Sequence, residues 1–183
     1  MAGLVALGAV VVVALVVVGL YNALVRARVR VDEAWSGIAT QLKRRHDLVP
    51  NLVETVRGYA AHERGVLERV TELRGRAAAA PTPAEAAQAE GLLTQALRGL
   101  YAVAERYPDL KASQSFLALQ QALGQTEDAI AESRRAYNAA VRDLNTRVQS
   151  APTNVLAGLF GFTPREFFEL EDPAERAVPQ VRF

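Results

Sequence analysis

The first 25 residues differ from the rest of the chain in their hydrophobic pattern. From Ala2 to Tyr21, twenty consecutive residues carry no charged side chain, and twelve of them are Leu or Val. As a helix that rises about 1.5 Å per residue, this run spans roughly 30 Å, the thickness of the hydrocarbon core of a bilayer. The pattern predicts a transmembrane anchor at residues 1–25, a helical body at 26–170 and a C-terminal tail at 171–183.

A cleaved signal peptide is the alternative interpretation of this segment. The start Met1-Ala2-Gly3 contains no Lys or Arg, and no small-x-small cleavage site follows the apolar run. The run also exceeds the length of about 7 to 15 residues that is usual for the apolar region of a signal peptide. We therefore expect the anchor to be retained.

Basic side chains follow the anchor, and only the α-amino group precedes it. They are Arg26, Arg28, Arg30, Lys43, Arg44 and Arg45. Because basic residues stay on the cytoplasmic side of a membrane span, this asymmetry places the N-terminus outside and the body in the cytoplasm.

After the anchor, apolar residues recur at alternating steps of three and four. They are Val31, Trp35, Ile38, Leu42, Val49, Leu52, Val56, Tyr59, Val66, Val70 and Leu73. This heptad pattern predicts one long helix from Arg28 to Leu73 that packs along its length on other helices. Pro50 falls inside it, but the pattern keeps its phase on both sides, so we expect a kinked and continuous helix.

Two positions of this apolar face are polar, Arg45 and Glu63. In one interpretation, Arg45 extends its charged end to solvent and Glu63 is partly exposed where the bundle widens. In the other, both residues meet charged partners and fix the register of the helices. We prefer the first interpretation, because buried ion pairs are weak evidence for any particular role.

Two further long helices are predicted. Thr82 and Glu85 form a capping box around Pro83, so a second helix begins there and continues to the break at Tyr107-Pro108-Asp109. A third helix is expected at about 115–149, because apolar residues recur there on one side. Polar pairs on its surface, such as Asn138 with Asn145, are interpreted as solvated or interhelical contacts in preference to a binding site.

Short helices are expected near the C-terminus. Pro152 opens one at Thr153–Phe160, which Gly161 closes, and Thr163 begins a last apolar turn. Five of the six phenylalanines lie in this part of the chain: Phe160, Phe162, Phe167, Phe168 and Phe183. They are interpreted either as a plug for the end of the bundle or as an exposed patch for a partner subunit or the bilayer. The tail at 171–183 contains two prolines and is expected to be extended.

The fold class expected from these elements is all-α. A single N-terminal transmembrane helix continues into an antiparallel bundle of three long helices with short C-terminal helices. The balance of 21 Lys and Arg against 20 Asp and Glu argues against a nucleic-acid-binding protein. The absence of Cys excludes disulfides and cysteine nucleophiles.

Candidate catalytic and metal-binding residues are few. His62-Glu63 lacks the second histidine of an H-E-x-x-H motif, and His46 is not spaced as its helical partner. The carboxylates of Glu127 and Asp128 diverge by about 100° on a helix. No phosphate-binding glycine motif or nucleophile elbow occurs. The chain is therefore expected to be no enzyme and to bind no cofactor or metal.

Several segments together resemble a known family. They are YNALVRARVRVDEAWSGIATQLKRRHDLVPNLVETVRGYAAHE, AVAERYPDLKAS, TEDAIAESRRAYNAAVRDLN and LFGFTPREFF. From about Tyr21 to Phe183 the chain is similar to the LemA family of bacterial membrane proteins. The resemblance implies one N-terminal span in the bacterial inner membrane, a cytoplasmic helical body and no catalytic residues.

The function expected from the sequence is structural. Rigid helices fixed to membrane spans would pack side by side into a homo-oligomeric scaffold, with Arg45, Glu63 and the five C-terminal phenylalanines as hypothetical contact residues. The alternative is an adaptor that binds another membrane protein, such as a membrane protease or a sensor. An enzyme that uses His46, His62 and Glu127 comes third.

Overall fold

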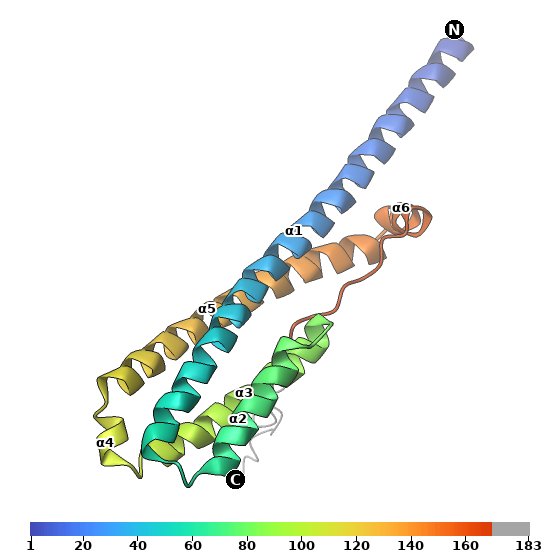
Figure 1. Ribbon diagram of the computed structural model, residues 1–183. Coiled ribbons are helices and arrows are strands. Elements are labelled where there is room, and N and C mark those ends of the chain that lie inside the picture. The colour runs from blue at the N-terminus through green and yellow to red at the C-terminus, as the bar shows by residue number, and fades with distance from the viewer. Residues whose placement is uncertain (170–183) are drawn as a thin grey trace, which may run out of the picture. The chain divides into compact units, whose positions relative to one another are not determined.

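The computed structural model describes residues 1–169, and helices are their regular secondary structure (Figure 1). In chain order these are α1 (Ala2–Tyr59), α2 (Arg64–Ala78), α3 (Pro83–Ala104), α4 (Pro108–Lys111), α5 (Gln114–Gln149) and α6 (Thr153–Phe160). No strand occurs within this part of the chain, so the predicted all-α class is confirmed. The predicted extended tail, with Phe183, lies outside the described residues.

The chain divides into two compact units. Unit 1 consists of Met1–Gly37 and Arg135–Glu166, and unit 2 consists of Ile38–Arg134 with the described residues from Phe167 on. Helices α1 and α5 each contribute one part to unit 1 and another part to unit 2. These units are defined by contacts within the chain, whereas the predicted division into anchor, bundle and tail is defined by which residues lie in a membrane. That division stays a prediction.

Helix α1 contains the apolar N-terminal run and continues far beyond it. All side chains from Ala2 to Val16 are exposed, whereas Leu24 and Val31 further along the helix are buried. By length and composition α1 is able to cross a membrane. The exposed apolar part therefore has the surface that lipid would cover, and the later part has the surface of a packed helix.

Pro50 lies inside α1 and does not end it, as predicted. Its own side chain is exposed, while Val49 and Leu52 beside it are buried in the core of unit 2. These core contacts hold the helix on both sides of the backbone hydrogen bond that proline cannot make.

The single long helix predicted through Leu73 is wrong. Helix α1 ends at Tyr59, the chain turns at residues 60–63, and α2 begins at Arg64. Arg74 of α2 donates from Nε to the backbone carbonyl of His46 at 3.0 Å, so α2 folds back along α1. The heptad pattern keeps its phase across the turn, because such a pattern records which face is apolar and not where the chain reverses.

Unit 2 is a bundle of four helices, one more than predicted. Helices α2 and α3 pack on each other, and parts of α1 and α5 complete the bundle. Its apolar core includes Val49, Leu52, Val56, Leu67, Val70, Leu73, Leu93, Leu97, Leu100, Phe116 and Leu123. Burial of this continuous set is the main force that holds the four helices together.

The predicted helix ends at α3 and α6 are confirmed. The Thr82 hydroxyl accepts a hydrogen bond from the Glu85 backbone N–H at 3.2 Å, and Pro83 occupies the first turn of α3. Gly161 closes α6 with a φ of 68°, a left-handed conformation that glycine adopts without strain. The single turn of α4 was not predicted.

The second short helix predicted at Thr163 is wrong, because the described residues after Gly161 are not helical. The Asn145 side chain accepts from the Arg165 N–H at 2.8 Å and donates to the Arg165 carbonyl at 2.9 Å. The Tyr137 hydroxyl donates to the Glu166 carbonyl at 2.9 Å. Side chains of α5 thus bind the backbone groups that a helix at this place would use for itself.

In unit 1 the N-terminal part of α1 pairs with the C-terminal part of α5. The rings of Trp35 and Tyr137 lie 5.5 Å apart, and Arg30 forms an ion pair with Asp143 at 2.5 Å. Residue numbers rise along α1 as they fall along α5, so the two helices are antiparallel there. Burial raises the pKa of the Tyr137 phenol above its ordinary value.

Candidate functional site

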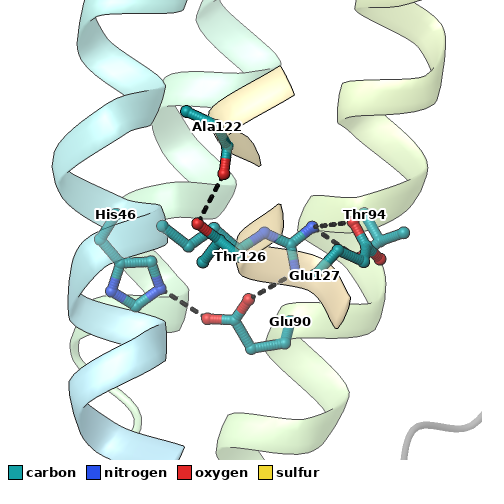
Figure 2. A network of polar contacts seen from close by, with 7 residues as sticks. His46, Glu90, Thr94, Ala122, Thr126 and Glu127 are labelled. Atoms are coloured by element: carbon teal, nitrogen blue, oxygen red, sulfur yellow. Dashed lines mark hydrogen bonds and ion pairs between the residues drawn. The ribbon is translucent and has the colours of Figure 1, made fainter. Parts of the chain in front are cut away.

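A cluster of polar side chains lies inside unit 2, where three helices meet (Figure 2). Arg45 and His46 come from α1, Glu90 and Thr94 from α3, and Glu127 from α5. Arg45, His46 and Glu90 are buried, although charged side chains are rarely buried unless they are paired. We refer to these five residues as the Arg45–Glu90 cluster.

Arg45 is the centre of this cluster. One of its terminal nitrogens, Nη1, forms an ion pair with Glu90 Oε2 at 3.2 Å. The other, Nη2, donates to the Thr94 hydroxyl at 2.7 Å and lies 3.7 Å from Glu127 Oε2. The guanidinium therefore has partners on α3 and α5, which fixes the position of α1 against both helices.

Glu90 has partners for both of its carboxylate oxygens. While Oε2 binds Arg45, Oε1 lies 2.5 Å from His46 Nε2 (Figure 2). Only 1% of Glu90 is exposed, so two direct contacts replace the water that its carboxylate has lost. A carboxylate engaged in this way positions helices and is poorly placed to exchange protons with a substrate.

The preferred interpretation of Arg45 is wrong, because the side chain meets charged partners inside the bundle and does not extend to solvent. Glu63 is partly exposed, as expected, and it also has partners. Its Oε1 accepts from Arg106 at 2.8 Å and from the Tyr107 hydroxyl at 3.4 Å. Glu63 thereby ties the turn between α1 and α2 to the segment that joins α3 to α4.

A pocket of about 270 Å³ adjoins the cluster. Residues that line it include Arg45, Thr94, Arg98, Tyr101, Gln120 and Glu127. Burial raises the pKa of the Tyr101 phenol, and the neighbouring Glu127 carboxylate adds to this rise while Arg45 opposes it. The pocket thus contains one half-exposed carboxylate, Glu127, beside the paired Arg45.

On the same helix as His46, Asp47 accepts a hydrogen bond from Lys43 at 2.6 Å, one turn earlier. This hydrogen bond is the main reason that the pKa of the Asp47 carboxyl lies below its ordinary value. Both side chains are exposed, so the pair belongs to the surface of α1 and not to the cluster.

The predicted phenylalanine cluster is divided between the two units. In unit 1, Phe162 is buried, whereas Phe160 is 55% exposed. In unit 2, Phe168 is completely buried and Phe167 is half-buried. Phe162 and Phe168 therefore act as core residues of their own chain, and among the four phenylalanines at 160–168 it is Phe160 that presents a large apolar surface.

No metal site stands out in the described part of the chain. Among residues 1–169, no group of three or more His, Cys, Asp or Glu side chains is placed to hold a metal ion. His46 contacts Glu90 and is not grouped with His62. That the protein binds no cofactor stays an expectation.

The profile of the LemA family matches residues 34–183, more than half of the chain. The chain belongs to the LemA family. The match covers every member of the Arg45–Glu90 cluster and excludes the apolar run at residues 2–21. The cluster is therefore part of the LemA-family body.

Three named relatives are similar to this LemA-family chain. Protein LemA of Metamycoplasma hominis is 28% identical over 146 residues, which are 78% of this chain and 65% of that protein. Magnetosome protein MamQ 2 of Paramagnetospirillum magneticum is 37% identical over 86 residues, 47% of this chain and 31% of that protein. Magnetosome protein MamQ of Magnetospirillum gryphiswaldense is 26% identical over 180 residues, 84% of this chain and 66% of that protein. The chain thus spans between 31% and 66% of the length of these relatives.

Sequence reasoning missed the roles of Glu90 and His46 in this LemA-family bundle. A signal for Glu90 exists, because it follows Ala86 by four residues and precedes Leu93 and Leu97 by three and seven. It therefore occupies a core position on the apolar face of α3. An acidic residue at such a position, together with Arg45 on another helix, indicates a buried pair.

Proposed function

We propose that this LemA-family protein is a single-pass membrane scaffold that self-assembles at the bacterial inner membrane. The observation that carries the proposal is α1, because one helix contains both an exposed apolar run of membrane length and the buried positions of the bundle. Within unit 1, α1 continues without a break from the apolar run to the buried positions Leu24 and Val31. Neighbouring copies anchored in this way would meet in a fixed orientation.

The orientation that we propose has the N-terminus outside and the body in the cytoplasm. Arg26, Arg28 and Arg30 are exposed just beyond the apolar run, as the positive-inside rule requires of the cytoplasmic side. Arg45 adds little to this argument, because it lies beyond the stretch of about 15–20 residues beside a span in which basic residues set the orientation. The remaining basic residues still favour the same orientation.

A structural role, without catalysis, agrees with the contacts of the polar residues. The Arg45–Glu90 cluster uses its groups to join helices, and both oxygens of Glu90 have partners within the chain. The names of the relatives, a LemA protein and magnetosome proteins, state no reaction. We therefore propose that the protein is not an enzyme.

Self-assembly is tested by the mass of the full-length protein in mild detergent. Light scattering of the purified protein is expected to give the mass of several chains, and the mass of a single chain would refute self-assembly. Single cysteines at successive positions from Val10 to Val16 provide a second measurement, because the chain contains no native Cys. If anchors pack on one another, disulfide crosslinking in membranes should recur with the helical period of about 3.6 residues.

An adaptor that binds another membrane protein, such as a membrane protease or sensor, is the second candidate. The pocket beside Glu127 favours it, since a volume of about 270 Å³ suits a side chain or a short segment of a partner. Crosslinking in cells should then recover one dominant partner through a photoreactive residue placed at Gln120. Crosslinks to copies of the same chain alone would count against the adaptor.

A further inference from the structure

Helix α6 packs on the end of the apolar run of α1. Leu156 and Ala157 of α6 are buried together with Leu24 of α1 and Phe162. Val17 and Leu20, within the apolar run itself, pack against this cluster. Helix α6 therefore lies beside the part of α1 in which the run of uncharged residues ends.

Aromatic rings define the same position. The ring of Tyr21 lies 4.9 Å from the ring of Phe160 and 6.0 Å from that of Phe162, in edge-to-face arrangements. Such pairs stabilise packing beyond the area that they bury. Tyrosine is also enriched where a membrane span reaches the headgroups.

The other face of α6 is apolar and uncovered. Val155 is 63% exposed, Leu159 is 74% exposed and Phe160 is 55% exposed. No charged side chain occurs from Ser150 to Pro164. A contiguous apolar face of this kind on a helix marks a surface that another apolar phase covers.

Charge on this part of unit 1 is positive. Arg26 and Arg28 are exposed, and the guanidinium of Arg28 lies 5.3 Å from the centre of the Phe162 ring. The chain contains no Asp or Glu before Asp32 and none between Asp143 and Glu166. Basic residues at a membrane surface attract anionic lipids.

We propose that α6 is an interfacial helix whose Val155, Leu159 and Phe160 side chains enter the boundary between headgroups and acyl chains of an anionic bilayer. Arg26 and Arg28 bind lipid phosphates beside it. This inference rests on the proposed membrane anchor.

The depth of α6 agrees with this assignment. From Tyr21 to Arg26, α1 rises about 8 Å at 1.5 Å per residue, so α6 lies within one and a half turns of the first charge. Interfacial helices are buried about 5–10 Å deep at this boundary. The eight residues of α6 span about 12 Å, too short to cross the bilayer.

A lipid surface fits this face better than a second copy of the chain. The cluster that holds α6 includes Val17 and Leu20 at the end of the apolar run, and the earlier side chains of the run, from Ala2 to Val16, are all exposed. The phase that covers the anchor therefore also reaches α6. A neighbouring copy is the competing occupant, and quenching by nitroxide-labelled lipids distinguishes it from a lipid surface.

Three single-cysteine variants test the proposal in the full-length protein: Val12→Cys, Leu159→Cys and Leu117→Cys. Leu117 is the matched control, because it is an exposed leucine of α5 in unit 2, at 47%. Each cysteine carries an environment-sensitive fluorophore in vesicles of phosphatidylcholine and phosphatidylglycerol. None of the three replaced side chains is buried, so the helical content should stay unchanged.

Lipids with a nitroxide at the top of the acyl chain are expected to quench the probe at Leu159 more strongly than lipids with a nitroxide at the chain end, as for a group at the interface. A nitroxide at the chain end should quench the probe at Val12 more strongly, and Leu117 should respond to neither. Replacement of Arg26 and Arg28 by glutamine should weaken the quenching at Leu159 and remove its dependence on phosphatidylglycerol.

Each other outcome overturns a defined part of the account. Quenching at Val12 without quenching at Leu159 would refute the interfacial helix and leave the anchor in place. Quenching at neither position would refute the anchor, and with it the interfacial helix. A probe at Leu159 that is shielded from aqueous iodide but untouched by both nitroxides would show that a second copy covers α6, which overturns the proposal.

Discussion

Replacing Glu90 with leucine is expected to destabilise unit 2 strongly. Glu90 is 1% exposed and is the shared partner of Arg45 and His46. Without it, the buried Arg45 guanidinium retains the Thr94 hydroxyl at 2.7 Å and the more distant Glu127 at 3.7 Å. A positive charge would then remain in the bundle with little compensation.

The expected cost follows from these contacts. Removing one partner of a buried ion pair costs about 3–5 kcal/mol, and leaving a buried polar group unpaired costs about 1–3 kcal/mol. Glu127 offsets only part of the loss, because its side chain is 54% exposed and solvent screens its charge. We expect a loss of about 3–4 kcal/mol for Glu90→Leu, which lowers Tm by about 2–4 °C per kcal/mol for a chain of this size.

A double variant separates the buried charge from other effects. In Arg45→Met combined with Glu90→Leu, both charges are replaced by apolar groups, a change that is often neutral or stabilising. Stability should therefore recover, except for about 1–3 kcal/mol from the His46 ring nitrogen that has lost its acceptor. Glu72→Ala is the control, because its ion pair with Arg69 has side chains that are more than half exposed, and it should cost less than about 1 kcal/mol.

The assay is urea unfolding of the full-length protein in mild detergent, followed by far-UV circular dichroism. A shift of the midpoint at constant slope reports a change in stability alone. The reasoning is refuted if Glu90→Leu costs no more than the Glu72→Ala control. It is also refuted if the double variant is as unstable as the single one, since the buried charge would then not be the cause.

Three further predictions concern other parts of the structure. Burial raises the pKa of the Tyr101 phenol above its ordinary 10.0. The stability that the protonated phenol contributes is therefore complete below pH 10.0 and is lost as the pH rises through the higher pKa of the folded state. Urea midpoints should accordingly fall less steeply in alkali for Tyr101→Phe than for the unchanged protein. Gly161→Ala should lower stability by about 1–2 kcal/mol, because the φ of Gly161 is 68° and alanine is strained there. Gly99→Ala inside α3 should raise stability by about 0.5–1 kcal/mol, because no atom lies within 4 Å of the added methyl group. Equal effects of the two substitutions would contradict this reasoning. Asn145→Ala removes two hydrogen bonds to the backbone of Arg165. Hydrogen exchange of the Arg165 amide should become at least tenfold faster, which corresponds to about 1.4 kcal/mol or more. Unchanged exchange would show that other contacts hold the backbone around Arg165.

The helical class and most helix ends were predictable from local chemistry. Thr82 and Gly161 act within one turn of their own positions, and apolar periodicity reports the buried face of a helix directly. Features that depend on contacts between distant residues were not predictable in this way. The turn at residues 60–63 preserves the heptad phase, so the same apolar pattern describes one long helix and two antiparallel ones.

The Arg45–Glu90 cluster and the non-helical segment after Gly161 also depend on contacts between distant residues. Arg45 on an apolar face has two physically reasonable states, extended to solvent or paired inside, and only the position of Glu90 on α3 decides between them. The Thr163 capping pattern is overridden by Asn145 and Tyr137, whose side chains lie far away in the sequence and bind the same backbone. Tertiary hydrogen bonds of this kind compete with local capping and are invisible to it.

The direct test of the membrane-scaffold account is the accessibility of single cysteines in intact cells. Ala2→Cys and Ser115→Cys replace exposed residues, one at the start of α1 and one in α5. A membrane-impermeant maleimide should label Ala2→Cys in spheroplasts and should label Ser115→Cys only after the membrane is broken. Labelling of both variants in intact spheroplasts, or of Ser115→Cys alone, would contradict an outside N-terminus and a cytoplasmic body.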